Sequence, residues 1–238
     1  MSSNVNPKVI GDQPAEPVDL SKKWRVRSDL ANHKDLRRAK LKGIQLAGAS
    51  LSGRALQGAD LREADLFMAD LTGADLAGCD LRDAVLDHAK LARASLFRAD
   101  LSGASLRSAD LSGADLDGVS LKEADLSFAC LSKARLTHAD LEQTNLRNAV
   151  LRGAYLHGAN LTKADLREAD LGQTKLMGAN LTRADLRGVK NFLFRDLRHI
   201  EFQRTKGSLL ILLTGMLRRL QDQFLNPSTS SDQSSART

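Results

Sequence analysis

The stretch ADLREADLFMADLTGADLAGCDL, residues 59–81, places a leucine at every fifth position. An α-helix turns by about 100° per residue, so a five-residue step would spread these leucines around the whole helix and leave it without an apolar face. In a straight strand the side chains alternate, so an odd step would send every second leucine to the opposite surface. Neither regular element explains the spacing, and the chain must therefore bend once in every repeat.

The leucine register runs from Leu36 to Leu186 at every fifth position, which makes 31 repeats. Alanine stands two places before leucine in 24 of them. The exceptions are Lys34, Ile44, Arg54, Cys79, Val119, Thr144 and Thr174. In an extended segment these two positions point the same way, so one large and one small apolar group can fill a narrow interior. The other three positions, rich in Asp, Arg, Lys, Ser and Gly, are expected to face water.

The position just before leucine is Asp in 14 repeats, Ser in 4 and Asn in 3. These side chains bond to nearby backbone amides and favour turns. Glycine is frequent two places after leucine, as at Gly43 and Gly153. Each pentapeptide is therefore interpreted as one side of a coil with its corner just past the leucine. Stacked coils of this kind pair backbone to backbone as an all-β parallel solenoid.

The run A-[D/N]-L-x-x, repeated from about Lys34 to Lys190, resembles the pentapeptide-repeat family. The resemblance implies a right-handed parallel β-helix of square, quadrilateral cross-section with four repeats per coil. On that basis the 31 repeats make a little under eight coils. At the usual inter-strand spacing, the rod would be about 35 to 40 Å long.

Five regions are expected along the chain: a flexible segment over 1–20, an N-terminal cap over 21–33, the β-helix over 34–190, a C-terminal cap and helix over 191–225, and a disordered tail over 226–238. The open end of a β-helix exposes apolar slots and unpaired backbone groups, so it needs a cover. Trp24 and Val26 are the candidates for the first coil. Lys34 and Arg54 occupy inward slots there, which predicts irregular first coils; ion binding by Arg54 is the alternative.

A C-terminal α-helix is predicted after the repeats, beginning near Ser208 as its N-cap. Its apolar stripe consists of Leu209, Leu213, Met216, Leu217, Leu220 and Phe224. Before it, the residues that could plug the far end of the rod are Phe192, Phe194, Leu197, Ile200 and Phe202. Because the helix is apolar beyond one stripe, it predicts a homodimer through the C-terminal ends, with capping alone as the alternative. Its apolar run is too short to span a bilayer, so a membrane partner is not expected.

Charge, cysteines and the N-terminal residues indicate the class of protein. The net charge is +6, but residues 34–190 hold 23 Lys and Arg against 21 Asp and Glu, so the rod is nearly neutral. Cys79 lies in an inward slot and Cys130 in an outward one, which argues against a disulfide. The first 23 residues contain no apolar run typical of a signal peptide, and a cytoplasmic location is expected, although secretion without a signal peptide would leave no such trace.

No motif brings catalytic groups together: the chain lacks G-x-G-x-x-G, a Walker loop, H-E-x-x-H, C-x-x-C and G-x-S-x-G. The sequence therefore predicts a non-enzymatic protein without a cofactor or metal. Two groups were weighed as metal ligands: His138 and His157 with Tyr155, and the column Asp60, Asp80 and Asp100. Solvent-facing residues and surface ion pairs with Arg62 and Arg82 are the favoured interpretations.

Outward residues provide the partner-binding candidates. Large apolar side chains fall at the outward positions of Phe67, Met68, Phe97, Phe128, Tyr155 and Met177. With four repeats per coil, Arg107, Arg147, Arg167 and Arg187 would stack in one column, which Asp125, Asp165 and Asp185 could neutralise. The candidate partner-binding set is Arg107, Arg147, Arg167, Arg187, Phe97, Tyr155 and Met177. Scattered exposed residues and surface ion pairing are the alternative for all of them.

The favoured function is a non-enzymatic scaffold, a rigid rod that presents columns of side chains to a protein partner. The family resemblance implies an alternative, because some pentapeptide-repeat proteins mimic DNA, bind type II topoisomerases such as DNA gyrase and confer quinolone resistance. A DNA mimic needs a strongly negative rod, since duplex DNA carries about one charge per 1.7 Å. The near-neutral repeat region departs from that, and direct nucleic-acid binding is disfavoured by the 4% aromatic content and the interleaved acids.

Overall fold

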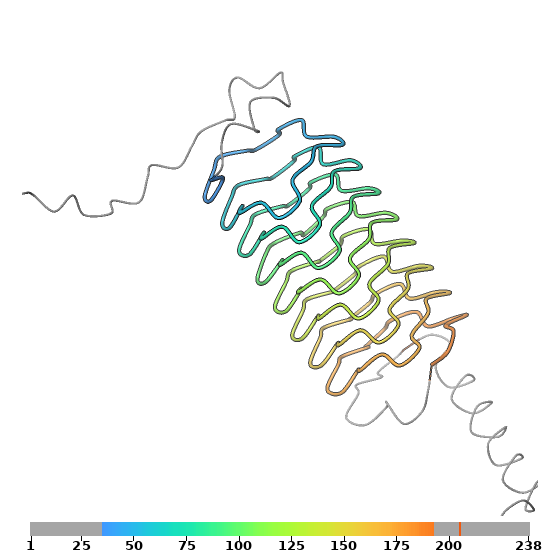
Figure 1. Ribbon diagram of the computed structural model, residues 1–238. Coiled ribbons are helices and arrows are strands. Elements are labelled where there is room, and N and C mark those ends of the chain that lie inside the picture. Colours follow the sequence, from blue (N-terminus) through green and yellow to red (C-terminus); the bar gives the residue numbers. More distant parts are fainter. Residues whose placement is uncertain (1–34, 193–204, 206–238) are drawn as a thin grey trace, which may run out of the picture.

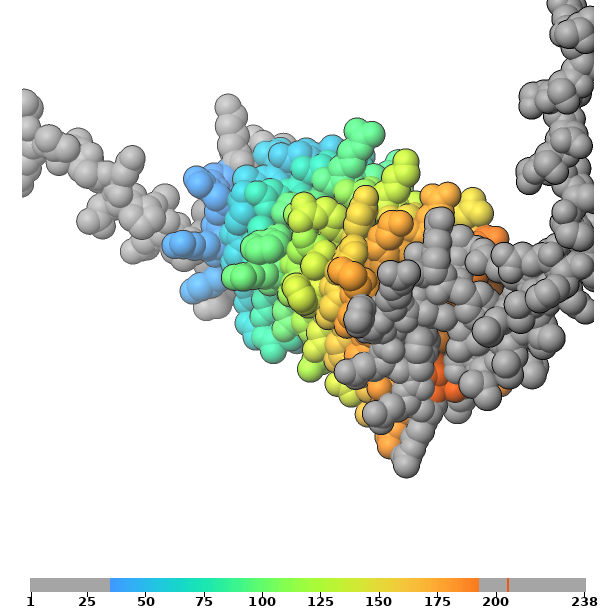
Figure 2. All heavy atoms as spheres, turned by 90° about the horizontal axis from the view of Figure 1, so that it is seen from below, coloured from blue at the N-terminus to red at the C-terminus, as the bar shows by residue number. Residues whose placement is uncertain are grey.

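The structure, a computed structural model, describes residues 35–192 and Thr205. Residues 35–192 wind into a straight rod of stacked coils, with the early coils at one end and the late coils at the other (Figure 1). Within these described residues there is no helix and no extended strand; each repeat instead contributes one residue to a parallel β-bridge. The space-filling view shows the coils following one another along the rod in chain order (Figure 2).

Parallel bridges run along the rod from Lys40↔Asp60 to Asp170↔Lys190, and each joins residues twenty positions apart. Twenty residues are four pentapeptides, so four repeats complete one coil. The same kind of position, just before the leucine, forms every bridge. The chain therefore forms the expected solenoid, with four repeats in each coil.

Hydrogen bonds between coils satisfy the backbone of each repeat. In the repeat around Leu101, the Leu101 amide donates to the Ser120 carbonyl at 2.8 Å and the Gly103 amide to Lys122 at 2.9 Å, both in the next coil. The Asp100 amide donates to Cys79 in the preceding coil at 2.9 Å. Buried backbone groups need such partners, so a coil without its neighbours would be unstable.

The corner of each repeat is a β-turn just past the leucine, as the sequence predicts. At Leu101 the turn is closed by the Ala104 amide, which donates to the Leu101 carbonyl at 3.0 Å. The residue two places after leucine has a positive φ, between 54° and 73°, in all 31 turns from Arg38 to Gly188. A single left-handed residue at this place is the mark of a type II turn. Only 13 of these residues are glycine, so 18 other side chains accept the left-handed conformation.

Carboxylates before leucine hold the corners. Asp70 Oδ1 accepts the Thr72 amide at 3.0 Å, and Asp110 Oδ1 accepts the Ser112 amide at 3.0 Å. The donor lies two residues beyond the acceptor in both cases, which is the local bond that suits Asp, Asn and Ser to turns. This bond explains the frequency of Asp at the position before leucine.

Leucine and alanine fill the interior as the register predicts. Every leucine from Leu36 to Leu186 is at most 3% exposed. Two threonines in the alanine slot are buried as well, and each donates to a leucine carbonyl: Thr144 Oγ1 to Leu121 at 2.7 Å and Thr174 Oγ1 to Leu151 at 2.8 Å. The slot therefore accepts a polar group when its hydrogen bond is satisfied.

The first coil corrects one expectation. The backbone is regular from Asp35 onward, and the Leu36 amide donates to Ala55 in the next coil at 3.2 Å. Arg54 is half-buried in its inward slot, yet its amide closes the ordinary turn to Leu51 at 3.1 Å. The irregularity that Arg54 was expected to cause is absent, because the backbone ladder does not depend on the side chain in that slot. Lys34 lies outside the described residues.

The register ends at Asn191, which takes a leucine position but has a φ of +58°. Phe192 is half-buried and packs against the core, as expected of a residue that plugs this end. The remaining end predictions lie outside the described residues: Trp24 and Val26, the stripe from Leu209 to Phe224, and the segments 1–20, 21–33 and 226–238. Among the described residues, none forms a helix long and apolar enough to cross a membrane.

The interior leucines provide a test of the fold. We expect Leu101→Ala to lower the free energy of unfolding by about 2 to 5 kcal/mol, because it leaves a cavity in a fully buried slot. Ser112→Ala is the matched outward control and should change it by less than about 0.5 kcal/mol, since the Ser112 hydroxyl has no hydrogen bond within residues 35–192. Ser102 is unsuited as a control because its hydroxyl bonds to Asp100 and Ser120. Urea unfolding measures both; equal losses would contradict the inside and outside assignment.

Candidate interaction surfaces

Four flat faces run along the rod, and each is defined by its column of bridge residues. Face 1 runs from Lys40 to Asn180, face 2 from Gln45 to Asp185, face 3 from Ser50 to Lys190, and face 4 from Ala55 to Lys175. Each face also carries the two residues that follow its leucines. Because two corners separate faces 2 and 4, they lie on opposite sides of the rod.

Charge is spread over all four faces of the described rod. Face 1 holds seven Lys and Arg against eight acids, face 2 four against six, and face 3 five against three. Face 4 holds five against four when Asp35, Arg37 and Arg38 of the first repeat are included. The net charges are thus −1, −2, +2 and +1. No face has the dense single-sign charge of a polyanion mimic.

An ion-pair ladder occupies face 1 at the column Asp60, Asp80 and Asp100, the alternative metal site of the sequence analysis. Arg62 lies 2.7 Å from Asp60 in its own coil and 3.5 Å from Asp80 in the next. Arg82 continues the ladder, at 2.6 Å from Asp80 and 3.7 Å from Asp100. These distances agree with the favoured interpretation, in which the Asp and Arg side chains of this column form surface ion pairs. Over residues 35–192, no group of three or more His, Cys, Asp or Glu side chains is placed to hold a metal ion.

The arginines in these ladders favour the ionised carboxylates. The hydrogen bond from Arg62 lowers the pKa of Asp60, and that from Arg82 lowers the pKa of Asp80. On face 2 the pKa values of Asp165 and Asp185 are lowered in the same way, by Arg167 and Arg187. Partial burial opposes the shift at each site, and the charge-assisted hydrogen bond outweighs it.

The arginine column on face 2 forms as predicted, and its C-terminal part is neutralised. Arg167 Nε donates to Asp165 at 2.8 Å and lies 3.8 Å from Asp185 of the next coil. Arg187 Nε donates to Asp185 at 2.9 Å. For these two arginines, the interpretation as surface ion pairing agrees with the geometry.

The other two arginines of the column differ. Arg147 follows Asn145, whose amide donates to Asp125 at 3.0 Å, so no carboxylate pairs with Arg147. The Arg107 amide donates to Asp87 at 2.9 Å. Neither guanidinium has an ion pair within residues 35–192. A partner-binding role for Arg107 and Arg147 stays a prediction.

The aromatic and methionine candidates lie on face 4, away from the arginine column. Phe97, Tyr155 and Met177 are 42%, 45% and 57% exposed. Tyr155 and His157 have ring centroids 6.3 Å apart with an interplanar angle of 29°. The candidate set thus divides between two opposite faces and cannot form one contact surface. Reasoning by residue type alone missed this division.

An exposed apolar patch on face 2 was missing from the candidate set. Phe67, Met68 and Val85 are 38%, 55% and 39% exposed, and the Phe67 ring meets the edge of the His88 ring at a centroid distance of 5.8 Å. The sequence signal was present: with a period of twenty residues, Met68 stacks on His88 and Val85 stacks on Asp65. We call Phe67, Met68, Val85 and His88 the face 2 patch.

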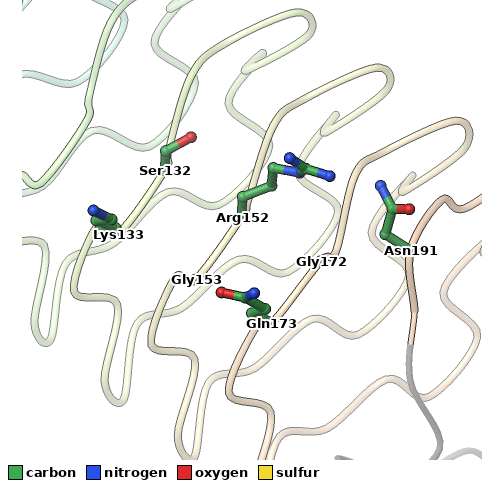
Figure 3. A pocket seen from close by; sticks show the side chains of 7 residues that line it. All are labelled: Ser132, Lys133, Arg152, Gly153, Gly172, Gln173 and Asn191. Atoms are coloured by element: carbon green, nitrogen blue, oxygen red, sulfur yellow. The ribbon is translucent and has the colours of Figure 1, made fainter.

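Face 3 carries a shallow groove of about 550 Å³ near the last coils (Figure 3). Its lining is Ser132, Lys133, Arg152, Gly153, Gly172, Gln173 and Asn191. Gly153 and Gly172 have no side chains, and this leaves the groove open. Asp170 beside it is saturated, since it takes Arg152 Nε at 2.8 Å, Asn191 Nδ2 at 2.9 Å and the Gly172 amide at 3.0 Å.

Burial keeps the thiol of Cys79 in its neutral form. Both cysteines are free; Cys79 is buried and Cys130 is half-buried. Burial raises the pKa of the Cys79 thiol to about 12, so it stays protonated, and its Sγ donates to the Leu56 carbonyl at 2.9 Å.

Sequence comparison agrees with this geometry. The family described as Pentapeptide repeats matches the chain in eight copies, over residues 35–66, 65–103, 94–137, 129–167, 154–190 and 164–204. The chain belongs to the pentapeptide repeat family. Comparison with curated proteins gives no significant match.

Solved pentapeptide repeat structures resemble the rod. HetL, a pentapeptide repeat protein involved in heterocyst differentiation regulation from the cyanobacterium Nostoc sp. strain PCC 7120, is 30% identical, with 76% of this chain and 92% of HetL covered and a TM-score of 0.50. A trypsin-treated form of QnrB1, a plasmid-mediated fluoroquinolone resistance protein, is 23% identical, with 77% and 93% covered and a TM-score of 0.61. The fold of this pentapeptide repeat protein is thus the right-handed quadrilateral β-helix.

The ion-pair ladders predict an acid-dependent stability. A carboxylate whose pKa is lowered on folding stabilises the rod fully above its unfolded pKa, and this contribution is lost as the pH falls through the folded value. Asp80→Asn and Asp165→Asn keep a turn acceptor but remove the charge. We expect each to lower the free energy of unfolding at pH 7 and to have a smaller effect at pH 2.5. Urea unfolding at both pH values measures this.

The matched control is Asp110→Asn, because Asp110 accepts the Ser112 amide but has no ion pair within residues 35–192. Its effect should be small at both pH values. A pH-independent loss for Asp80→Asn and Asp165→Asn would show that the ladder contributes no charge-dependent stability.

Proposed function

We propose that this protein is a non-enzymatic scaffold that binds a protein partner through its flat faces. The distribution of exposed apolar side chains carries the proposal. Seven large hydrophobic side chains are exposed on the described rod: Phe67, Met68, Val85, Phe97, Phe128, Tyr155 and Met177. Four lie on face 2 and three on face 4, and faces 1 and 3 have none. Confinement to two faces favours interaction surfaces over random exposure.

The architecture suits such a role. Every coil is tied to its neighbours by backbone hydrogen bonds, so outward side chains are held at fixed spacings. A partner that contacts a rigid face loses less conformational entropy than one that must order a loop. Membership of a repeat family whose extended surfaces bind partners agrees with this role.

Two finer points belong to the same proposal. The partner is a protein, because neither the charge distribution nor the aromatic content favours nucleic acid. A homodimer through the C-terminal helix, with a contact built from the stripe Leu209 to Phe224, remains a prediction that lies outside the described residues. A cytoplasmic location likewise remains a proposal.

Partner capture tests the scaffold function. Full-length protein coupled to resin should retain a reproducible set of proteins from the source cell. Two face variants, Phe67→Ser with Met68→Ser on face 2 and Phe97→Ser with Met177→Ser on face 4, should divide that set, because each removes exposed apolar contact area from one face. Quantitative mass spectrometry measures retention. If both variants retain every protein as the parent does, the apolar faces are not the binding surfaces.

The alternative function, modulation of DNA gyrase by DNA mimicry, conflicts with the charge distribution of the rod and can be tested directly. The described rod has no strongly negative face, so we expect the purified protein at micromolar concentration neither to inhibit DNA gyrase supercoiling nor to protect it from a quinolone. A gel assay of plasmid supercoiling measures both. Salt-sensitive inhibition would establish the topoisomerase role and disprove the charge argument.

A further inference from the structure

The face 2 patch has an acidic frame. Asp65 precedes Phe67 in the same repeat, and Asp87 stacks on Phe67 in the next coil. Asp83 lies at the corner just before Val85. Asp65 and Asp87 are thus neighbours of Phe67 on face 2, and Asp83, a residue of face 1, lies two residues before Val85 across the shared corner.

The carboxylates of the frame form no ion pair within residues 35–192, although Asp83 is close enough to Arg82 to help raise the pKa of that guanidinium. Asp65 Oδ1 accepts the Phe67 amide at 3.1 Å, and Asp87 Oδ1 accepts the Arg107 amide at 2.9 Å. Neither these two carboxylates nor that of Asp83 has an ion pair within residues 35–192. A fourth acid, Glu63, is paired with Lys42 at 3.0 Å. Acids without an ion pair also occur elsewhere on the described rod, as at Asp70 and Asp110. The three acids here differ in that they lie next to exposed apolar side chains, Phe67, Met68 and Val85.

The backbone beneath the patch excludes an added strand. The Asp65 amide donates to Ile44 at 2.9 Å and the Leu66 amide to Val85 at 2.7 Å. The Met68 amide donates to Asp87 at 2.9 Å. With its amides bonded to both neighbouring coils, this side of the rod offers no edge for an extended peptide. A partner must bind through side chains.

We infer that the face 2 patch binds a basic amphipathic helix of a protein partner. Such a helix presents apolar residues at three- and four-residue spacing, about 5 to 6 Å apart, which matches the separation of adjacent coils at about 4.8 Å. Its flanking lysines or arginines would neutralise Asp65, Asp83 and Asp87. Anionic partners, nucleic acid and lipid surfaces included, are repelled by the same acids. The inference rests on the proposed scaffold function and names the surface and the partner class.

A defined probe tests this inference with the full-length protein. The probe is a fluorescein-labelled 16-residue peptide with leucines at helical spacing and lysines on the remaining face. Fluorescence anisotropy should give binding at micromolar concentration in low salt, weakening as salt rises. A peptide of the same composition in scrambled order should bind at least tenfold more weakly. A version with glutamate in place of lysine should not bind at the patch. The net charge of +6 can only attract it non-specifically.

Variants locate the site. Phe67→Ser with Met68→Ser should raise the Kd of the probe at least tenfold. Asp65→Asn, Asp83→Asn and Asp87→Asn together should raise it about tenfold in low salt and remove most of its salt dependence. The matched control on face 4, Phe97→Ser with Asp75→Asn and Asp115→Asn, should leave it within twofold. Far-UV circular dichroism and urea unfolding confirm that each variant is folded.

Three results would overturn the inference: equal binding of the lysine and glutamate helices, equal losses from face 2 and face 4 variants, or no binding of the lysine helix. One further variant identifies a different occupant. Residues 21–28 of this chain, SKKWRVRS, are themselves basic and apolar. If the probe binds only after Lys22, Lys23, Arg25 and Arg27 are changed to serine, the chain occupies its own patch and the partner assignment is wrong. If the probe test fails but the two face variants still retain different sets of captured proteins, the inference about the helix is wrong and the scaffold function is still supported.

Discussion

The hydrogen bonds between successive coils determine the other features of this molecule. They bind the position before leucine, the leucine itself and the left-handed turn residue to the coils on either side, as around Leu101. This pairing repeats every twenty residues and leaves only two side chains per repeat pointing inward. A narrow interior of fixed width then accepts one large and one small group, which is why leucine and alanine recur. Thr144 and Thr174 fit because each finds a carbonyl within the same ladder.

The turns lower the stability of the rod, because each contains a residue in the left-handed conformation. They also accept many types of residue on the outside of the rod. Left-handed backbone costs about 1 kcal/mol or more for a residue other than glycine, yet 18 such residues occupy it here. The interior and the ladder must offset that cost in every coil. Outward turn positions accept varied side chains, Met68 and His88 among them. Some are restricted by their neighbours, since a Cβ at Gly103 would collide with the Asp83 side chain of the preceding coil. Outward positions are therefore where function is free to differ among rods of the same fold.

Much of this arrangement can be predicted from the sequence, and the predictions that fail do so for physical reasons. The five-residue spacing determines which residues are inside, from Leu36 to Leu186. The period of twenty came from the family resemblance, and with it the stacking of Arg167 on Arg187 follows. Sequence reasoning was wrong at Arg54, because side-chain polarity in one slot does not control a backbone ladder. The partner-binding candidates, Tyr155 and the arginine column among them, are placed on two faces by the structure, and their role stays a prediction.

The balance of charge between faces bears on how a partner would be oriented. Face 2 has a net charge of −2 and the adjoining face 3 has +2, so a partner bound across their shared corner meets both signs within a short distance. Complementary charge of this kind directs orientation and register more than it adds affinity. Faces 2 and 4 are too far around the rod for one small domain to cover both, since two corners lie between them. Two apolar surfaces on opposite sides are thus best suited to two separate partners, and a rod with that property can hold them at a fixed distance from each other.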